Sequence, residues 1–142
     1  MPLTESQRTF LENNRSAAMI TIAKDGTPRA VRVGVALVDG KLWSSGTQDR
    51  VRTARLRRDP RCTLFVFNAG YNFLTLETTV RILDGDDAPQ LNLRLFRHMQ
   101  NRPVGPLNWF GQELDTEAFL QRMIAEKRLI YEINITHSYG MV

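Results

Sequence analysis

The sequence predicts an α+β fold in which about six strands form a small, mostly antiparallel barrel with short flanking helices. Two Asp-Gly pairs, beginning at Asp25 and Asp39, each lie between runs of alternating apolar residues, a pattern typical of antiparallel hairpins. Helix-like segments separate further strand-like runs. A chain of 142 residues with 42% hydrophobic content is long enough to bury a core as a single domain spanning 1–142.

The first half of the predicted barrel follows an N-terminal helix. Thr4 and Gln7 have the spacing of a capping box, which places the start of this helix at Thr4. Strands are expected over 17–23, 29–38 and 41–45, with the two Asp-Gly turns between them. The three runs therefore predict an antiparallel meander of two hairpins.

An arginine-rich helix is expected next, from about 49 to 58. It ends before Pro60, because a residue that precedes proline is pushed out of the helical region. Strands are predicted to resume over 62–67 and 73–83. These runs continue the antiparallel sheet.

Two more helices and one strand complete the expected order. Asp86 or Asp87 caps the first helix and Asp115 caps the second. A Pro/Gly-rich loop with two adjacent aromatic residues joins them over 102–111, and the last strand spans 128–137. Both helices have apolar stripes that are expected to pack into the core: Leu91, Leu95 and Met99 in the first, and Phe119, Leu120, Met123 and Ile124 in the second.

The net charge of the chain lies in one short segment. The chain has 19 Lys and Arg against 15 Asp and Glu, a formal charge of +4. Segment 49–61 contains six of the arginines and two of the aspartates, and the remaining 13 basic and 13 acidic residues balance. A broad nucleic-acid-binding surface is therefore disfavoured, and a local anion site is favoured.

Other features exclude several classes of protein. Cys62 is the single cysteine, so the chain has no intrachain disulfide, and a reducing, cytoplasmic location is expected. No apolar run has the length of a membrane span. The two histidines, His98 and His137, have no spaced partners, so no metal site is predicted. No motif for a hydrolytic nucleophile or a nucleotide-binding loop is present, so an enzyme of this sequence needs an organic cofactor to supply the reactive atoms.

The segment 44–53 is the best candidate for holding such a cofactor. A strand that ends in Ser44 and Ser45 leads into the N-terminus of the arginine-rich helix, where free N–H groups and the helix dipole stabilise a phosphate. Arg50 and Arg52 add charged donors, and Thr53 adds a hydroxyl. The alternative is an ordinary solvated basic helix capped by Asp49.

Three strings of the sequence carry a family resemblance: NRSAAMITIAKDGTPRAV at 14–31, RVRTARLRRDPRCTLFV at 50–66 and ITHSYG at 135–140. They resemble the pyridoxamine 5'-phosphate oxidase-like split β-barrel superfamily. More narrowly, they are similar to its short branch that binds the deazaflavin coenzyme F420. Where that family usually has a lysine, this sequence has Arg52.

The resemblance implies a homodimer that binds its cofactor in the cleft between two split barrels. It implies that the phosphate is held by Ser45, Arg50, Arg52 and Thr53, with Ser44 beside them. It places the backbone at Arg32 and Val33 beside the ring system of the cofactor. Weaker candidates are Tyr71 and the loop at Trp109, which would contribute across the dimer. Arg55 or Arg57 would lie near the anionic tail of F420.

The implied chemistry is hydride transfer between reduced F420 and a small organic acceptor, with no acid or base named in the protein. The alternatives are an FMN-binding oxidase or flavin reductase with the same fold, a non-enzymatic cofactor carrier, and a nucleic-acid binder that uses the arginine-rich helix. The sequence does not identify the acceptor.

Overall fold

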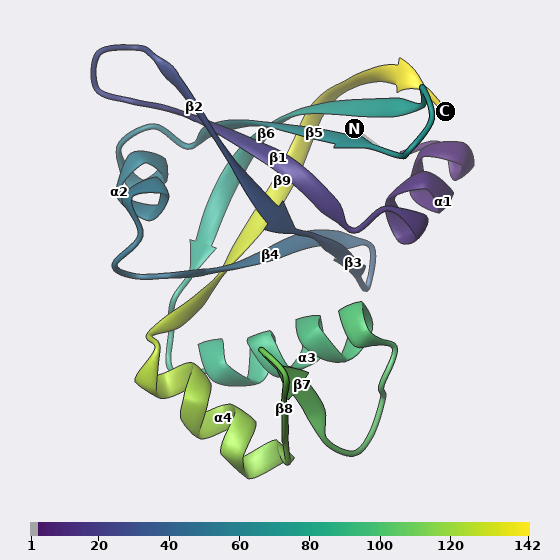
Figure 1. The fold of residues 1–142 in the computed structure, drawn as a ribbon. Helices are drawn as coiled ribbons and strands as arrows, with labels where there is room; N and C mark the ends of the chain where they lie inside the picture. The colour runs from purple at the N-terminus through teal and green to yellow at the C-terminus, as the bar shows by residue number, and fades with distance from the viewer. Residues whose placement is uncertain (1–2) are drawn as a thin grey trace.

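The computed structural model describes residues 3–142 and places a curled β-sheet against a layer made by two helices and a small hairpin (Figure 1). The elements are α1 (Glu5–Asn13), β1 (Ser16–Ile22), β2 (Pro28–Gly34), β3 (Ala36–Val38), β4 (Lys41–Thr47), α2 (Val51–Arg58), β5 (Arg61–Phe67), β6 (Phe73–Leu83), α3 (Ala88–Gln100), β7 (Leu107–Trp109), β8 (Gln112–Leu114), α4 (Thr116–Ala125) and β9 (Arg128–Met141).

Seven strands form the main sheet in the order β2-β1-β5-β6-β9-β4-β3, and all of their pairings are antiparallel. The two edge strands, β2 and β3, are separated in the chain only by Val35. Because one residue cannot span a flat seven-stranded sheet, the sheet curls until its edges approach each other. Ser44 Oγ donates to the Gly34 carbonyl across this approach, at 2.7 Å. The predicted α+β antiparallel split barrel is thus confirmed.

The strand count and the connection of the hairpins differ from the predictions. The run predicted as one strand over 29–38 divides at Val35 into β2 and β3, so the main sheet has seven strands rather than six. The two hairpins lie at opposite edges of the sheet, so the predicted meander is wrong. The predicted loop 102–111 also contains β7, which pairs with β8 in a separate two-stranded sheet. Alternation marks strands, but it does not determine which strands pair.

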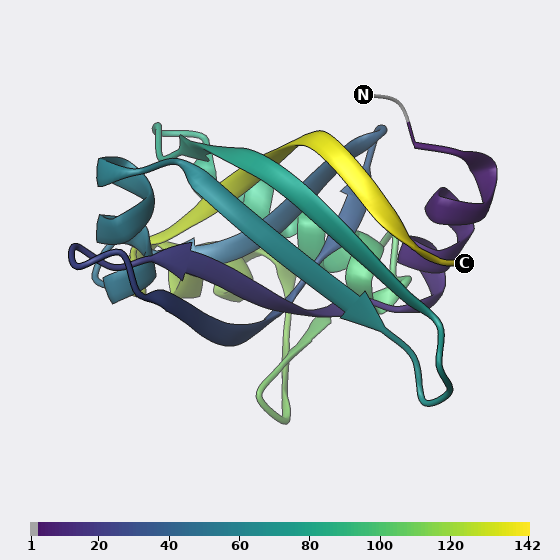
Figure 2. The ribbon, with the colours of Figure 1, turned by 90° about the horizontal axis from the view of Figure 1, so that it is seen from above.

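Both Asp-Gly turns are present, with different lengths. Asp39 and Gly40 both have positive φ, 51° and 78°, as a two-residue hairpin turn requires. In the first turn only Gly26 has positive φ, and Ala23 N donates to the Thr27 carbonyl at 2.9 Å, which leaves a three-residue loop. Figure 2 shows α2 beside this hairpin and α1 at the opposite end of the sheet.

The predicted N-cap residues are observed at three helices, although Asp87 of α3 makes no side-chain capping hydrogen bond. Thr4 and Gln7 form the reciprocal capping box of α1, and the Asp115 carboxylate accepts from Ala118 N at 2.8 Å in α4. Asp49, the cap in the alternative of an ordinary solvated helix, does not cap α2. The cap is Arg50, and its side chain makes no capping hydrogen bond. The Arg50 N–H donates to the Thr47 carbonyl at 3.3 Å, which holds Asp49 in a turn before the helix.

The core has two sides, which the last strand separates. Leu129, Tyr131 and Ile133 are buried inside the barrel, as the alternation predicts. Ile130, on the opposite face, packs with Leu95 of α3. Both faces of the first half of β9 are therefore covered. Within residues 3–142 no helix is long and apolar enough to cross a membrane.

Candidate functional site

A pocket of about 360 Å³ lies between the barrel and the helical layer. Four arginines line one part of it, namely Arg32 of β2, Arg50 and Arg52 of α2, and Arg128 of β9. We call this the arginine pocket. The other part is lined mainly by apolar side chains, which are Phe96, Met99, Trp109 and Phe110.

The charge of the arginine pocket is unbalanced. No carboxylate is present among the described residues that line it. Arg128 Nε donates to Glu126 Oε1 at 2.9 Å, so this cation has a carboxylate partner just outside the lining. Clustered cations in a partly enclosed space create a strong positive potential, which attracts anions.

Arg52 has a buried side-chain donor that lacks a partner among the described residues. Its Nε is buried and has no hydrogen-bond partner within residues 3–142. Burial lowers the pKa of the Arg52 guanidinium below its ordinary value, the Tyr131 hydroxyl opposes this change, and the cations Arg50 and Arg128 add to it. A buried donor without a partner is costly, so an acceptor atom near Arg52 would stabilise this side chain.

The chain places these cations by ending β4 directly before α2. Arg50 is the N-cap residue and Arg52 lies in the first turn of the helix. The first amides of a helix have no partner within the helix, and the positive end of its dipole lies there. Backbone donors and guanidinium groups therefore share the same end of α2, as the sequence predicts.

The hydroxyl residues of the predicted site have internal partners. Ser45 lines the arginine pocket and donates from Oγ to Asn92 Oδ1 at 2.5 Å. Ser44 is buried, and its hydroxyl connects β4 to Gly34. Thr53 is also buried and donates to the Thr47 carbonyl at 2.7 Å, so it lies behind the pocket rather than in its lining.

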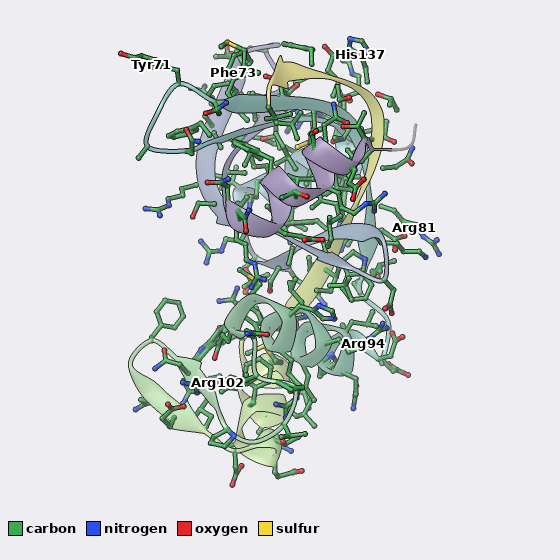
Figure 3. The ribbon with its side chains drawn as sticks, turned by 90° about the vertical axis from the view of Figure 1, so that its right-hand side faces the viewer. Tyr71, Phe73, Arg81, Arg94, Arg102 and His137 are labelled. Atoms are coloured by element: carbon green, nitrogen blue, oxygen red, sulfur yellow. The ribbon has the colours of Figure 1, made fainter. Side chains whose placement is uncertain are left out.

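The residues expected beside the ring system of the cofactor lie far from Tyr71, which was expected to contribute across the dimer. Arg32 and Val33 line the arginine pocket, and Arg32 Nη2 donates to Ser16 Oγ at 3.2 Å. Tyr71 is 93% exposed in the loop between β5 and β6, at the end of the sheet far from α3 (Figure 3). Trp109 lies on the wall of the same protomer's pocket. Its indole donates to Glu126 Oε2 at 3.1 Å.

The two arginines considered for the anionic tail of a cofactor also differ in their surroundings. Arg57 Nη2 lies 2.9 Å from Asp84 Oδ2 in an exposed ion pair. Arg55 is half-buried in the last turn of α2. Neither residue is among those that line the arginine pocket.

Sequence reasoning did not identify Arg128 as part of the site. This residue begins β9 and pairs with Thr47, the last residue of β4, which brings its side chain close to the start of α2. The guanidinium carbon of Arg128 lies 5.0 Å from the centre of the Trp109 ring. The signal existed only in the pairing of β4 with β9, which the sequence pattern does not reveal.

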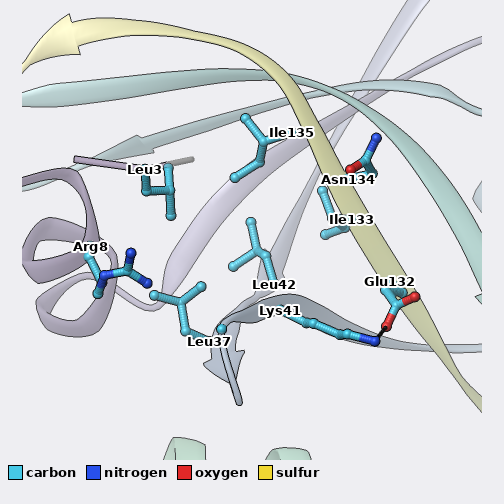
Figure 4. Close-up of a pocket in the computed structure, with 10 residues that line it drawn as sticks. Leu3, Arg8, Leu37, Lys41, Leu42, Glu132, Ile133, Asn134 and Ile135 are labelled. Atoms are coloured by element: carbon cyan, nitrogen blue, oxygen red, sulfur yellow. Dashed lines mark ion pairs between the residues drawn. The ribbon is translucent and has the colours of Figure 1, made fainter. Parts of the chain in front are cut away.

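A second pocket of about 400 Å³ lies beside α1, β4 and β9 (Figure 4). Leu37, Leu42 and Ile135 extend into the same space in that view. At its edge, Lys41 Nζ lies 3.6 Å from Glu132 Oε1, so cation and carboxylate offset each other there. The arginine pocket is therefore the better candidate for a ligand with several negative charges.

Cys62 has the properties of an inert core residue. It is buried, and burial raises the pKa of its thiol from 9.0 to about 11. The folded protein should therefore react slowly with a thiol reagent at about pH 8 and rapidly in urea. Between pH 9.0 and about 11 the unfolded thiol loses its proton while the folded thiol keeps it, so stability should fall as pH rises through that window.

The measurement is urea unfolding at increasing pH, with Cys62→Ala as the control that lacks this thiol. A wild-type curve that follows the curve of the control across the window would contradict the raised pKa of the Cys62 thiol.

No group of three or more His, Cys, Asp or Glu side chains suited to hold a metal ion occurs among the residues that the structure describes.

Solved structures with the same architecture support the assignment of the fold. The conserved hypothetical protein Rv2991 from Mycobacterium tuberculosis is 21% identical, with a TM-score of 0.76 over 98% of this chain and 84% of that chain. An F420 reductase is 20% identical, with a TM-score of 0.71 over 96% of this chain and 98% of that chain. HutZ, the heme storage protein from Vibrio cholerae, is 11% identical, with a TM-score of 0.67 over 98% of this chain and 94% of that chain.

These likenesses establish the fold alone, since one fold can serve proteins with different functions. The family comparison is more specific. The model of the pyridoxamine 5'-phosphate oxidase family matches residues 3–139, which is nearly the whole chain and includes β2, α2 and the start of β9. The chain therefore belongs to the pyridoxamine 5'-phosphate oxidase family.

Proposed function

We propose that the arginine pocket binds the phosphate of the deazaflavin coenzyme F420, and that the protein transfers a hydride between the reduced cofactor and a small organic acceptor. The observation that carries this proposal is the buried Nε of Arg52, which has no hydrogen-bond partner within residues 3–142, together with a pocket that four arginines line. A phosphate offers several acceptor oxygens and a full negative charge to such donors.

The residues have distinct roles in this proposal. Arg50 and Arg52 bind the phosphate, and Arg128 lies close to them at the start of β9. Ser45 retains acceptor capacity on Oγ after donating to Asn92. The backbone at Val33 lies beside the ring system. The bound deazaflavin supplies the hydride chemistry, and the protein provides orientation and excludes water.

FMN is the alternative cofactor, and membership of the family supports it. Both cofactors present a phosphate, so the end of α2 suits either one. F420 is preferred because its tail carries negative charges beyond the phosphate, and the pocket has four guanidinium groups with no lining carboxylate among the described residues. With FMN, the protein would be an oxidase or a flavin reductase.

We also propose that two copies form a dimer with the cofactor in the cleft between their barrels. Ala30 and Val31 of β2 and Phe67 of β5 line an open pocket of about 660 Å³ on the outside of the barrel. Phe67 is 56% exposed, and Tyr71 extends from the adjoining loop. A second copy would cover this apolar surface.

A cytoplasmic location is part of the same proposal. The single cysteine, Cys62, is a buried free thiol, which is consistent with a reducing compartment.

The test is titration of protein from a host that makes no F420, followed by ligand fluorescence. F420 should bind with a Kd of about 1 µM or tighter, which corresponds to about −8 kcal/mol, and FMN should bind more weakly. Reduced F420 should then lose its electrons only when an acceptor is added. Tighter binding of FMN would favour the flavin alternative, and binding without turnover would indicate a carrier. Failure to bind either ligand would refute the proposal.

A further inference from the structure

A chain of buried hydroxyl groups lies directly behind the arginine pocket. The Tyr131 hydroxyl is in hydrogen-bond contact with Thr53 Oγ1, which lies 2.7 Å from the Thr47 carbonyl oxygen. A threonine hydroxyl has one proton, and a carbonyl oxygen can only accept. Thr53 therefore donates to Thr47, and Tyr131 donates to Thr53. This direction leaves the lone pairs of the Tyr131 oxygen available to a further donor.

The Tyr131 ring is held in one position. Tyr131 is completely buried in the barrel and pairs through its backbone with Ser44. Gly46, two residues along β4 on the same face, has no side chain, and the ring occupies the space that a Cβ would need. The phenol oxygen therefore has a fixed location beneath the first turn of α2.

Arg52 lies over this fixed ring. Its guanidinium carbon is 5.8 Å from the ring centre, within the range of a cation–π interaction. The Tyr131 hydroxyl is the neighbour that favours the charged form of Arg52, whereas burial and the cations Arg50 and Arg128 oppose that form and lower its pKa. Burial and the neighbouring cations destabilise the charged Arg52 guanidinium, and Tyr131 offsets part of this effect.

We infer that Tyr131 is a positioning residue, which acts with Thr53 to hold the Arg52 guanidinium toward the arginine pocket for a ligand phosphate. This inference rests on the proposed function, because it assumes that a phosphate binds there. Tyr131 touches no ligand and is not a catalytic residue. Thr53, whose hydroxyl is engaged inside the protein, contributes by orienting the Tyr131 hydroxyl and not by touching the phosphate.

Tyr131→Phe removes the hydroxyl and keeps the ring, so it tests the positioning role separately from packing. The informative quantity is the ratio of affinities for a ligand with the phosphate and its counterpart without one. The two pairs to measure are FMN with riboflavin, and F420 with its phosphate-free deazariboflavin core. Tyr131→Phe should lower this ratio about tenfold, because it removes the hydroxyl that favours the charged form of Arg52, while affinity for the phosphate-free ligand stays unchanged.

Matched variants complete the experiment. Thr53→Val should lower the ratio as Tyr131→Phe does, and it replaces that variant if the phenylalanine protein does not fold. Thr53→Ser keeps the hydroxyl and should retain the wild-type ratio. Tyr139→Phe removes a hydroxyl from the half-exposed part of the same strand and should have no effect.

The outcomes separate this inference from the proposed function. If the wild-type protein gains nothing from a phosphate in either pair, the phosphate site itself is wrong and the positioning role falls with it. If the wild type gains affinity but Tyr131→Phe and Thr53→Val leave the ratio unchanged, only the positioning role is wrong. Equal weakening of both ligands in a pair would show a purely structural role and would also overturn the inference.

Discussion

Replacing both Arg50 and Arg52 with alanine should weaken F420 binding by at least about a hundredfold. Each arginine is expected to make charge-assisted hydrogen bonds to the phosphate, and such bonds contribute roughly 1.5–3 kcal/mol each. Two of them correspond to a loss of about two to four powers of ten in affinity. Fluorescence titration of the double variant against the wild-type protein measures this loss.

The control removes the same charge elsewhere. Arg8 and Lys24 are exposed and do not line the arginine pocket, so Arg8→Ala with Lys24→Ala should bind F420 as the wild type does. Unchanged binding in the Arg50 and Arg52 double variant would place the phosphate away from α2. Equal losses in both double variants would instead indicate a general effect of net charge.

Gly46→Ala should destabilise the fold by about 3 kcal/mol, at the upper end of the usual cost of overpacking a core. A Cβ at this position would lie against the phenol ring of Tyr131, far inside van der Waals contact. The ring is completely buried between neighbouring strands, so it cannot move aside without disturbing the barrel. The measurement is the midpoint of urea unfolding together with its slope.

Two further variants make this prediction specific. At Gly70 a Cβ would meet only the Asn68 side chain, at an ordinary contact distance of 3.5 Å, so Gly70→Ala should be nearly neutral. Tyr131→Leu shortens the side chain that fills the space at Gly46, so the double variant should lose less stability than the sum of the two single changes. Strict additivity, or a Gly46→Ala protein as stable as the wild type, would contradict the role of Gly46 as space for the ring.

The elements that the sequence predicted well are those with strong local signals. β6 has the predicted bounds, 73–83, and the caps at Thr4 and Asp115 are present because capping depends on a few adjacent residues. The division at Val35 was missed, since the residues on both sides continue the same alternation. What separates β2 from β3 is their pairing with different strands, a long-range property.

The sequence predicted the part of the candidate site at the start of α2 and missed the part at the start of β9. Arg50 and Arg52 carry a local signal, since a basic segment follows the end of a strand and begins a helix. Arg128 lies about eighty residues away in the chain, and only the pairing of β4 with β9 brings it to them. The hydroxyl of Thr53 was expected at the phosphate because of its place in the sequence. Burial and the contact with Tyr131 place it behind the arginines instead.

By itself, the sequence determined the fold class, the family resemblance, and the concentration of the whole net charge within 49–61. These properties are local, because periodicity, turns, caps and charge runs depend on residues close together in the chain. The tertiary structure alone decided which arginines share a pocket, and it shows that within residues 3–142 the buried Nε of Arg52 has no hydrogen-bond partner. It also decided which hydroxyl lies beside Arg52. Those properties depend on how the curled sheet brings distant strands together, since burial and the pairing of charges arise only when they meet.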